Sequence, residues 1–568
     1  MTSPLQPTSV MNGIDSLNGF IENYRRSAVV KPRSWDDTLL FRKYQLPGSL
    51  DLAARKKAAV TKFAKNCQRL KMDLVHFENV VEFDLQANDS DQAIMLKRAR
   101  EICHAAFRPY SRGSMHNSVN RALDFPKGAG YATRRADTRN AKYHKGVTLT
   151  DHALKYAVRN LKCDIFAPNS VGQGETRKMT FVRGNRFITV PKNTETERLI
   201  CIEPEVNLYY QKGIGSWLKT VVKDSFGIDL SCQNRNRTQC ANFAFSTIDL
   251  SSASDSVTNA LVEFLLPRRV FTMLRAFRSP SSQMYDVTIK NTSSYSTFST
   301  MGNGYTFELE SLIFTCLARA ASEFHGCDPD EVTVFGDDII IRNEAASSAV
   351  ELLLLCGFKT NLDKSFLGNA PMRESCGFFF EKYGDHALMV SPLALKGKFQ
   401  RSIYVKTNGR GESVAAIPLD PELIRVHNEM VRYIDTTNMA YRNDKLYRFY
   451  GAVIKKIRSL FPGNMQGRGY FGENQYLLVD SLCMPLEEIQ TVVRRTACYK
   501  WTNRLLGKGL YGPPQRSHDE SLDPKKIKSP SLHRSRMSFG MKDRWCGEVS
   551  TARYLGFHPM GDFLDKEW

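Results

Sequence analysis

Residues 332–343, VTVFGDDIIIRN, place two adjacent aspartates, Asp337 and Asp338, between two runs of β-branched residues. Valines alternate before Gly336 and isoleucines follow the aspartates, which predicts a β-hairpin whose turn is supplied by the glycine. Near-continuous Val and Ile predict burial on both faces of the strands. Two carboxylates in a partly buried place repel each other unless a cation neutralises them. The stretch therefore predicts a cation site at the tip of a hairpin.

A third carboxylate fits the same site. Asp249, in STIDLSSASDS, ends an apolar strand just before a turn, so we expect it to face Asp337 across neighbouring strands. The alternative use of Asp249 is to cap a helix, but Ser251 and Ser254 fill that role equally well. Carboxylate oxygens without His or Cys favour Mg²⁺, or Mn²⁺ in its place, over zinc. Two such ions close together suit phosphoryl transfer.

The charge balance indicates the partner. Lys and Arg number 79 against 59 Asp and Glu, a net charge of +20 in 568 residues. Such a balance favours a polyanion, usually nucleic acid. Together with the paired carboxylates it indicates nucleotidyl transfer along a nucleic acid. The chain is also too long for one hydrophobic core, which predicts several packed subdomains.

Other bulk features predict a soluble, cytoplasmic protein. The 13 cysteines include no CxxC pair, which favours reduced thiols over a zinc ribbon or a disulfide framework. The first residues lack the basic and apolar segments of a signal peptide. The longest apolar runs are too short to span a bilayer.

Periodicity predicts the elements around these motifs. Residues 51–107 read as helical, and the glycine-containing stretch STMGNGY precedes a long helix. Residues 178–204 are predicted to form two strands joined at RGN (183–185), followed by a basic loop. The pattern after residue 391 is mostly helical. The tail from residue 511 is rich in Pro, Ser and basic residues, which predicts an extended end.

The order of five blocks resembles motifs A to E of viral RNA-dependent RNA polymerases: STIDLSSASDS, STMGNGYTFELESLIF, VFGDDIII, GFKTNLDKSF and RESCGFFF. The run MGNGYTFELES is similar to the replicase catalytic β subunit of single-stranded RNA bacteriophages, the Qβ type of the leviviral family. Upstream, FITVPKNTETERLICIEP is similar to the basic finger motif of that family. The resemblance covers about residues 186–380, roughly a third of the chain.

The resemblance implies an α+β, right-hand fold of fingers, palm and thumb. Residues 1–245 would form the N-terminal region and fingers, with the basic finger motif at about 180–204. Residues 246–390 would form the palm, an antiparallel sheet with the GDD hairpin and a finger loop inserted near 299–306. Residues 391–568 would form the thumb and the basic C-terminal tail.

The resemblance also assigns the carboxylates. Asp249 and Asp337 would bind the two metal ions, with Asp338 beside them as a weaker or indirect ligand. The 3′-hydroxyl of the growing strand would attack the α-phosphate of a ribonucleoside triphosphate and release pyrophosphate. One residue departs from the family pattern, since Phe335 stands where the family usually has Tyr before GDD. We expect a small effect, because the aspartates carry the chemistry.

Five residues match nucleotide-binding positions of the family. Asp255 and Asn303 match the pair that senses the ribose 2′-hydroxyl, Lys192 and Arg198 match residues that pair with the triphosphate, and Lys364 matches a lysine that steadies the leaving pyrophosphate. Each has a plainer alternative: a charge at a helix start for Asp255, a turn residue for Asn303, solvated surface for Lys192 and Arg198, and a strand-edge lysine without a function for Lys364. An amide and a carboxylate together satisfy a hydroxyl that both donates and accepts.

Three further residues carry weaker assignments. Arg186 is a candidate for the same task as Lys192. Arg373 and Glu374, in RESCGFFF, either support the end of a strand near the junction of palm and thumb or simply pack in the core.

The resemblance implies partners and a location. The partners would be an RNA template and product, ribonucleoside triphosphates, the host translation elongation factors Tu and Ts, and for some members a small-subunit ribosomal protein. The cofactor would be Mg²⁺, with Mn²⁺ as a substitute. The chain would act in the cytoplasm of an infected bacterium, away from any membrane.

Two alternatives remain open. A reverse transcriptase shares the palm and the paired aspartates, but usually excludes the 2′-hydroxyl with an aromatic residue soon after the first aspartate. Small residues and a second acid, LSSASD, stand there in this sequence, which favours ribonucleotides. A basic RNA-packaging protein would also bind nucleic acid, but it needs no acid cluster within apolar strands.

Overall fold

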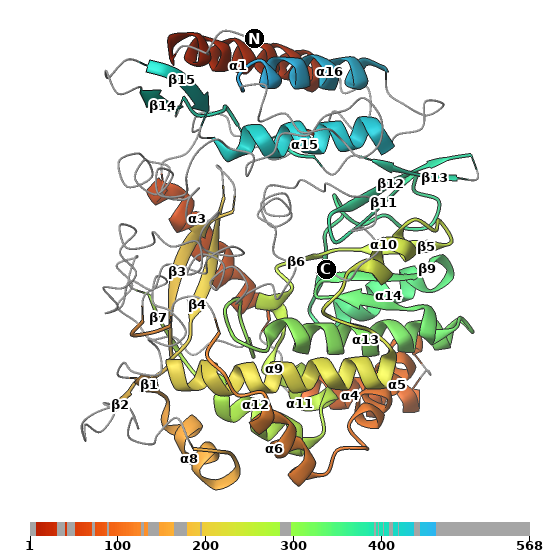
Figure 1. The fold of residues 1–568 in the computed structure, drawn as a ribbon. Coiled ribbons are helices and arrows are strands. Elements are labelled where there is room, and N and C mark those ends of the chain that lie inside the picture. The colour runs from red at the N-terminus through yellow and green to blue at the C-terminus, as the bar shows by residue number, and fades with distance from the viewer. Residues whose placement is uncertain are drawn as a thin grey trace. The chain divides into compact units, whose positions relative to one another are not determined.

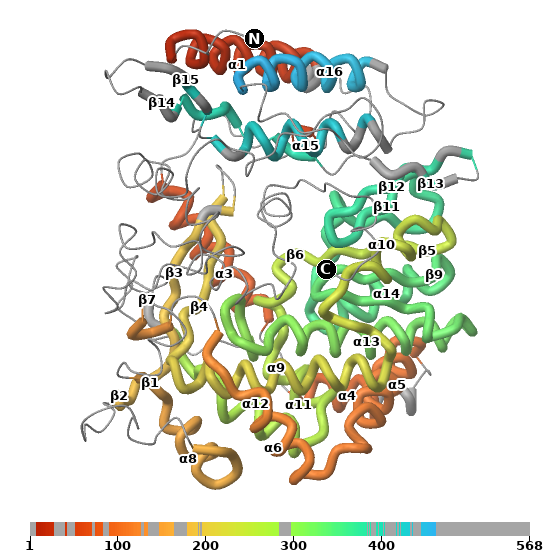
Figure 2. The backbone as a smooth tube through the Cα atoms, in the orientation of Figure 1, coloured from red at the N-terminus to blue at the C-terminus, as the bar shows by residue number. Residues whose placement is uncertain are grey.

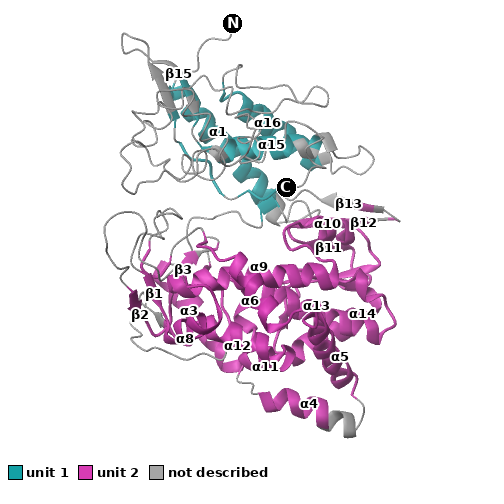
Figure 3. Ribbon diagram, turned by 60° about the horizontal axis from the view of Figure 1, so that its bottom comes forward, with its two compact units in different colours: residues 1–47, 391–568 teal, residues 48–390 magenta. Residues whose placement is uncertain are grey.

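The computed structural model divides the chain into two compact units, residues 48–390 and residues 1–47 with 391–568 (Figure 3). Helices and strands are mixed in both units, so the predicted α+β class is confirmed. The division into three regions stays a prediction. The structure describes residues 7–30, 40–41, 52–70, 74–87, 90–126, 130–133, 147–163, 179–192, 196–284, 297–384, 386–390, 393–395, 397–401, 403–407, 413–418, 420–436 and 444–461. The predicted extended tail from residue 511 lies outside them.

The unit of residues 48–390 holds the sequence blocks named above. Its helices are α3 (Leu52–Arg69), α4 (Leu74–Ala87), α5 (Asp91–Ala106), α6 (Arg112–Arg121), α8 (Asp151–Asn160), α9 (Glu205–Phe226), α10 (Asn234–Cys240), α11 (Asn259–Leu265), α12 (Arg268–Phe277), α13 (Thr306–Phe324) and α14 (Asn343–Leu355), with 3₁₀ turns η2 (Ser254–Ser256) and η3 (Pro329–Glu331). The helical prediction for residues 51–107 is confirmed by α3, α4 and α5. The long helix predicted after STMGNGY is α13.

The strands form small sheets. They are β1 (Val147–Leu149), β2 (Met179–Phe181), β3 (Asn185–Pro191), β4 (Glu197–Ile202), β5 (Phe245–Ile248), β6 (Leu250–Ser251), β7 (Ser282–Met284), β8 (Thr333–Phe335), β9 (Asp338–Arg342), β10 (Lys359–Thr360), β11 (Met372–Ser375), β12 (Phe378–Tyr383) and β13 (His386–Val390). The sheet order is β5-β9-β8, β4-β3-β7 and β11-β12-β13, with pairs β1-β2 and β6-β10.

The strands around RGN differ from the prediction. The strand before RGN, β2, pairs in parallel with β1 and not with β3. Strand β3 pairs instead with β4, whose residues were predicted to form a basic loop. The alternation of buried Glu197, Leu199 and Cys201 with outward Arg198 is the period-two pattern of a strand. Strands β3 and β4 therefore form an antiparallel hairpin, with Lys192 directly after β3 and Arg198 within β4.

Helix α13 is the centre of this unit. Most of its residues are buried, among them Leu309, Ile313, Phe314 and Leu317, each almost fully. The helix therefore lies inside the unit. It runs beside α9 (Figure 1) and packs against strands β8 and β9 of the three-stranded sheet.

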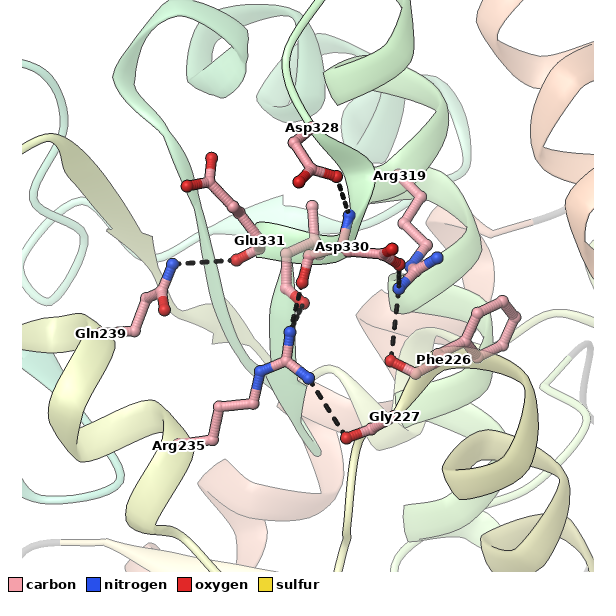
Figure 4. A network of polar contacts seen from close by, with 9 residues as sticks. Phe226, Gly227, Arg235, Gln239, Arg319, Asp328, Asp330 and Glu331 are labelled. Atoms are coloured by element: carbon pink, nitrogen blue, oxygen red, sulfur yellow. Dashed lines mark hydrogen bonds and ion pairs between the residues drawn. The ribbon is translucent and has the colours of Figure 1, made fainter.

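Polar contacts fix the segment that leads into β8 (Figure 4). Arg319 of α13 donates to Asp330 at 2.7 Å, and Arg235 of α10 donates to the main-chain oxygen of Asp330. Gln239 donates to the carbonyl of Glu331 at 3.0 Å. Helices α10 and α13 thus hold the start of the hairpin that carries the two aspartates.

The second unit joins the two ends of the chain. It contains α1 (Pro7–Val30), the hairpin β14 (Ile403–Thr407) and β15 (Ser413–Pro418), α15 (Pro421–Thr436) and α16 (Asp444–Arg458). The ring of Phe449 in α16 stacks on Tyr24 of α1 at 3.8 Å between centroids. Asn18 of α1 exchanges hydrogen bonds with the main chain of Phe399 at 3.0 and 2.8 Å.

Across the described part of the chain, no helix combines the length and the apolar character needed to cross a bilayer.

Candidate active site

The two aspartates lie where a tight hairpin turns. Strands β8 and β9 are antiparallel, with Phe335 paired to Asp338, so Gly336 and Asp337 form a two-residue loop. Gly336 has φ of +64°. Hairpins of this length need such a left-handed residue, which glycine adopts without steric cost. The strand residues that follow are fully buried, and Asp338 is half-buried.

Helix α13 supports this turn from one side. The Ser311 hydroxyl accepts a hydrogen bond from the Gly336 N–H at 2.9 Å. The rings of Phe307 and Phe335 meet edge to face, with centroids 5.0 Å apart. A Cβ on Gly336 would lie 2.7 Å from the Phe307 ring, so close packing also requires glycine here. The edge-to-face contact gives Phe335 a packing role that does not depend on a tyrosine hydroxyl.

Asp249 reaches the same end of the sheet. It follows β5, whose last residue Ile248 is paired with Ile339 of β9. Asn361 donates to Asp249 Oδ2 at 2.6 Å, and the Ser365 hydroxyl accepts from the Asp249 N–H at 3.0 Å. Both partners come from the GFKTNLDKSF block. Asp249 is therefore a strand-end carboxylate held by its neighbours, and it caps no helix.

The carboxylates repel one another. Burial, followed by the charge of Asp249, raises the pKa of Asp337. Burial, followed by Glu374 and Asp337, raises the pKa of Asp338 to about 7. In the described ranges, no group of three or more His, Cys, Asp or Glu side chains is in position to hold a metal ion as it stands. The donors are nevertheless hard carboxylate oxygens whose repulsion a divalent cation would relieve, so their chemistry fits Mg²⁺ or Mn²⁺.

Lys364 lies beside these acids. Its Nζ is 3.6 Å from Asp249 Oδ1. Burial lowers the pKa of Lys364, but the charges of Asp249, Glu374, Asp338 and Asp337 outweigh it and raise the pKa. The neighbouring carboxylates therefore stabilise the charged form of Lys364.

The β3–β4 hairpin brings further cations. Lys192 opens its turn, with its N–H bonded to the Thr196 carbonyl at 3.0 Å, and Arg198 pairs with Val190. Burial and then the charges of Arg198, Lys364 and Lys62 lower the pKa of Lys192. These cations are thus close enough to repel one another, as expected of a site that awaits a polyanion. Of the candidates, Arg186 does something else, because its guanidinium lies over the Tyr131 ring at 5.2 Å.

Asp255 and Asn303 lie near one main-chain segment. The Asp255 carboxylate accepts a hydrogen bond from the Met301 N–H, two residues before Asn303. The Asn303 side-chain oxygen accepts from the Tyr305 N–H at 3.0 Å. Asn303 lacks the positive φ expected of a turn residue of unusual conformation. Burial raises the pKa of Asp255 to about 6, against the effect of that hydrogen bond and of the Lys62 and Arg198 charges.

Because the pKa of Asp255 is raised, replacing this carboxyl with a neutral group is expected to stabilise the folded protein in a pH-dependent way. The unfolded carboxyl ionises near pH 4 and the folded one near pH 6, so the folded protein loses stability as the pH rises between these values. Asp255→Asn is expected to raise the free energy of unfolding above pH 6 by on the order of 2 kcal/mol, and to change it little at pH 4. Denaturant unfolding at both pH values measures this. An equal change in the free energy of unfolding at both pH values would contradict the prediction. The control is Asp363→Asn, which makes the same change at an exposed site.

The glycine loop before α13 is tied down. The Cys201 N–H donates to the Met301 carbonyl at 2.7 Å, and the Gly304 N–H donates to Gln211 Oε1 at 2.9 Å. Gly302 has φ of +113°, and a Cβ there would overlap the Cys201 carbonyl oxygen. The loop is therefore fixed against β4 and α9 at the residues that flank Asn303.

Gly302→Ala is expected to cost at least about 2 kcal/mol of folding stability, because both the backbone conformation and the contact with Cys201 oppose a side chain. Thermal unfolding of the full chain measures this. Gly326→Ala is the matched control, since Gly326 also has positive φ (+68°) but a Cβ there meets no atom within 4 Å. Equal losses for the two variants would show that the contact with Cys201 is unimportant.

Arg373 is fully buried and connects several main-chain segments by hydrogen bonds. Its guanidinium donates to the carbonyls of Phe245, of Ala370 at 2.8 Å and of Gly368 at 2.6 Å. It thereby joins β5 to the loop before β11. Glu374, next to it, accepts from the Gly377 N–H at 3.1 Å and is one of the charges that raise the pKa of Asp338.

Two groups of residues near the site were not predicted from the sequence. Glu310 of α13 is buried, accepts from the Ser254 hydroxyl at 2.9 Å, and has a pKa raised well above its ordinary value by burial and then by Asp337. The sequence signal for Glu310 was its place in TFELES, between the apolar residues Leu309 and Leu312. Lys62 and Asn66 of α3 also reach the site, but they lie in a segment without a recognised motif.

Comparison with known proteins agrees with this geometry. A family model described as RNA replicase, beta-chain, matches residues 35–498. The chain belongs to this family.

Relatives are similar over part of their length. The chain is 45% identical over 316 residues to an RNA-directed RNA polymerase subunit beta of Qbeta virus (strain MX1), which covers 55% of the chain and 48% of the relative. It is 36% identical over 294 residues to the RNA-directed RNA polymerase beta chain of Escherichia phage MS2, which covers 50% and 52%. The chain thus spans about half the length of these relatives. The match to a solved structure described as an RdRp complex covers 64% of this chain and 33% of the chain in that structure, at 12% identity and a TM-score of 0.36.

Proposed function

We propose that the chain is an RNA-dependent RNA polymerase, the catalytic subunit of a phage replicase. It copies single-stranded viral RNA from ribonucleoside triphosphates and releases pyrophosphate. Residues 1–245 would form the N-terminal region and fingers, residues 246–390 the palm, and residues 391–568 the thumb and C-terminal tail. The observation that carries the proposal is the meeting of Asp249 with the Gly336–Asp338 turn, beside a cluster of cations from other segments.

The acids have the character of a metal site. Asp249 and Asp337 would hold two divalent ions, with Asp338 as the weaker ligand, and Mg²⁺ is the expected ion. When bound, such ions lower the pKa of an attacking hydroxyl and stabilise a leaving oxygen. Asn361 and Ser365 keep the Asp249 carboxylate aimed from the end of β5.

The cations bind and orient the triphosphate. Lys192 and Arg198 would form charge-assisted hydrogen bonds with its phosphates and offset their charge. Lys364, held in its charged form by the acids, would steady the departing pyrophosphate. Binding the phosphates on both sides of the scissile bond places the α-phosphate before the 3′-hydroxyl.

Asp255 and Asn303 select the sugar. A carboxylate and an amide together would satisfy the ribose 2′-hydroxyl, which both donates and accepts a hydrogen bond. Their setting is rigid, because the loop between them and α13 is bonded to β4 and α9. A fixed polar pair discriminates against a sugar that lacks the hydroxyl, since it is then left unsatisfied.

The partners follow from the family. The relatives are named as beta subunits, which indicates a complex of several subunits. We propose that the elongation factors Tu and Ts, and a small-subunit ribosomal protein, join this chain in the cytoplasm of the infected bacterium.

A nucleotide-choice experiment tests the proposal. The full-length chain, purified with its host partners, is supplied with a single-stranded RNA template and Mg²⁺, and either ribonucleotides or deoxyribonucleotides. We expect template-dependent product from ribonucleotides alone. Product from deoxyribonucleotides would identify a reverse transcriptase instead, and RNA binding without either product would favour a packaging protein.

A further inference from the structure

Helix α3 comes from a segment outside the recognised motifs, yet it packs against two of them. Val60 and Phe63 are buried against Phe187 of β3 and Leu199 of β4, and the rings of Phe63 and Phe187 are 4.9 Å apart. Figure 2 shows α3 alongside these strands, which follow more than a hundred residues later. The helix therefore has a fixed position relative to the β3–β4 hairpin.

Asn66 holds the turn that carries Asp255. Its side-chain amide donates to the Asp255 carbonyl at 2.9 Å and to the Ser256 hydroxyl at 3.2 Å. Arg69, one turn further along, donates to the Asn66 side-chain oxygen at 2.8 Å and so fixes which end of the amide faces Asp255. These contacts join residues 66 and 255, which are far apart in the sequence, and they hold η2 to helix α3.

Lys62 lies on the same face of α3. Residues four apart on a helix are neighbours, so Lys62 lies one turn before Asn66. The Lys62 side chain is exposed. Its positive charge is close enough to lower the pKa of Asp255 and also the pKa of Lys192. Lys62 and Arg198 are therefore close to Asp255, and both are close to Lys192.

We propose that α3 is part of the nucleotide-binding site, with Lys62 as an additional cation for the phosphates of the incoming ribonucleotide and Asn66 as a positioning residue for Asp255. This inference rests on the proposed function, because it names further residues for the same substrate. Lys62 acts on phosphate charge, and Asn66 acts through Asp255 on the choice of sugar. The two roles therefore have separate signatures.

Equilibrium binding tests the role of Lys62. The full-length chain is titrated with α,β-methylene ATP and Mg²⁺ at fixed ionic strength. Lys62→Ala is expected to raise the Kd about three- to tenfold, and Lys62→Arg to restore it. The control is Lys57→Ala, which removes the same charge from an exposed site about 140° around the same helix. Equal Kd values for the Lys62→Ala and Lys57→Ala variants would overturn this role.

Sugar discrimination tests the role of Asn66. The affinity ratio of ATP to 2′-deoxy-ATP is measured for the wild type and for Asn66→Ala, and it is expected to fall about tenfold in the variant. Lys62→Ala should weaken both ligands and leave the ratio unchanged. An unchanged ratio in Asn66→Ala would overturn the positioning role.

These binding measurements separate the inference from the proposed function. Template-dependent synthesis by the wild type, with unchanged binding in the Lys62→Ala and Asn66→Ala variants, would overturn the inference alone. Triphosphate binding with the expected variant effects, but without any templated product, would overturn the proposed function and support α3 as a triphosphate site. A wild type that binds no triphosphate would overturn both.

Discussion

Asp249→Asn is expected to lower RNA-templated ribonucleotide incorporation by at least about a thousandfold, because it removes a charged ligand from the proposed metal site while keeping the size of the side chain. The fold should survive. The main chain of Asp249 stays bonded to Ser365 and Asn361, and strands β5 and β9 are unchanged. Because the variant loses one negative charge among these carboxylates, it should bind Mg²⁺ more weakly.

Two measurements decide this prediction. Incorporation is measured over a range of Mg²⁺ concentrations, and unfolding is followed in the same preparations. Asp363→Asn is the matched control, since it makes the same change at an exposed position two residues from Asn361. Asp249→Asn with activity within tenfold of the control would show that this carboxylate is not part of the reaction.

Arg373→Met is expected to destabilise the protein by at least about 4 kcal/mol, enough to prevent folding of a typical domain near body temperature. The guanidinium is fully buried and donates to several main-chain carbonyls that no substitution can remove. Exchange of a buried ion pair for apolar residues can be neutral when both charges go, but here the acceptors remain without donors. The expected result is low soluble yield and a greatly reduced unfolding midpoint.

The control for this prediction is an arginine of the β5-β9-β8 sheet. Arg342 of β9 pairs with Glu331 at 2.6 Å, and both side chains are about one-third exposed. Arg342→Met should therefore cost about 1 kcal/mol or less. Denaturant unfolding of both variants makes the comparison. Similar losses would mean that the buried hydrogen bonds of Arg373 contribute little more than a surface ion pair.

The sequence was sufficient for the hairpin and for the residues at its tip. Alternating valines, a glycine and the isoleucine run are local signals, and β8 and β9 form as they predict. The placement of Asp249 opposite the hairpin also followed from its position at the end of an apolar strand. Lys192, Arg198 and Lys364 gather near these acids as their motifs indicated. Their roles, like those of Asp255 and Asn303, stay predictions.

The contributions of distant segments were not predictable. Lys62 and Asn66 reach the site only because α3 packs on the β3–β4 hairpin, and nothing local in residues 52–69 specifies that contact. The strand β4 was missed because its basic and acidic residues resemble a loop, although alternate side chains are buried. The grouping of residues 1–47 with the C-terminal part is likewise a tertiary contact, formed by the apolar stripe of α1.

The central claim is that the carboxylates around the Gly336–Asp338 turn carry out templated RNA synthesis. The most direct measurement compares labelled ribonucleotide incorporation by the wild type and by Asp337→Asn, each as the full-length chain with a single-stranded RNA template, Mg²⁺ and a host lysate. We predict template-dependent product from the wild type and none above background from Asp337→Asn. Equal product from both would contradict the claim, because it would place the activity in a contaminating host polymerase and remove Asp337 from the reaction.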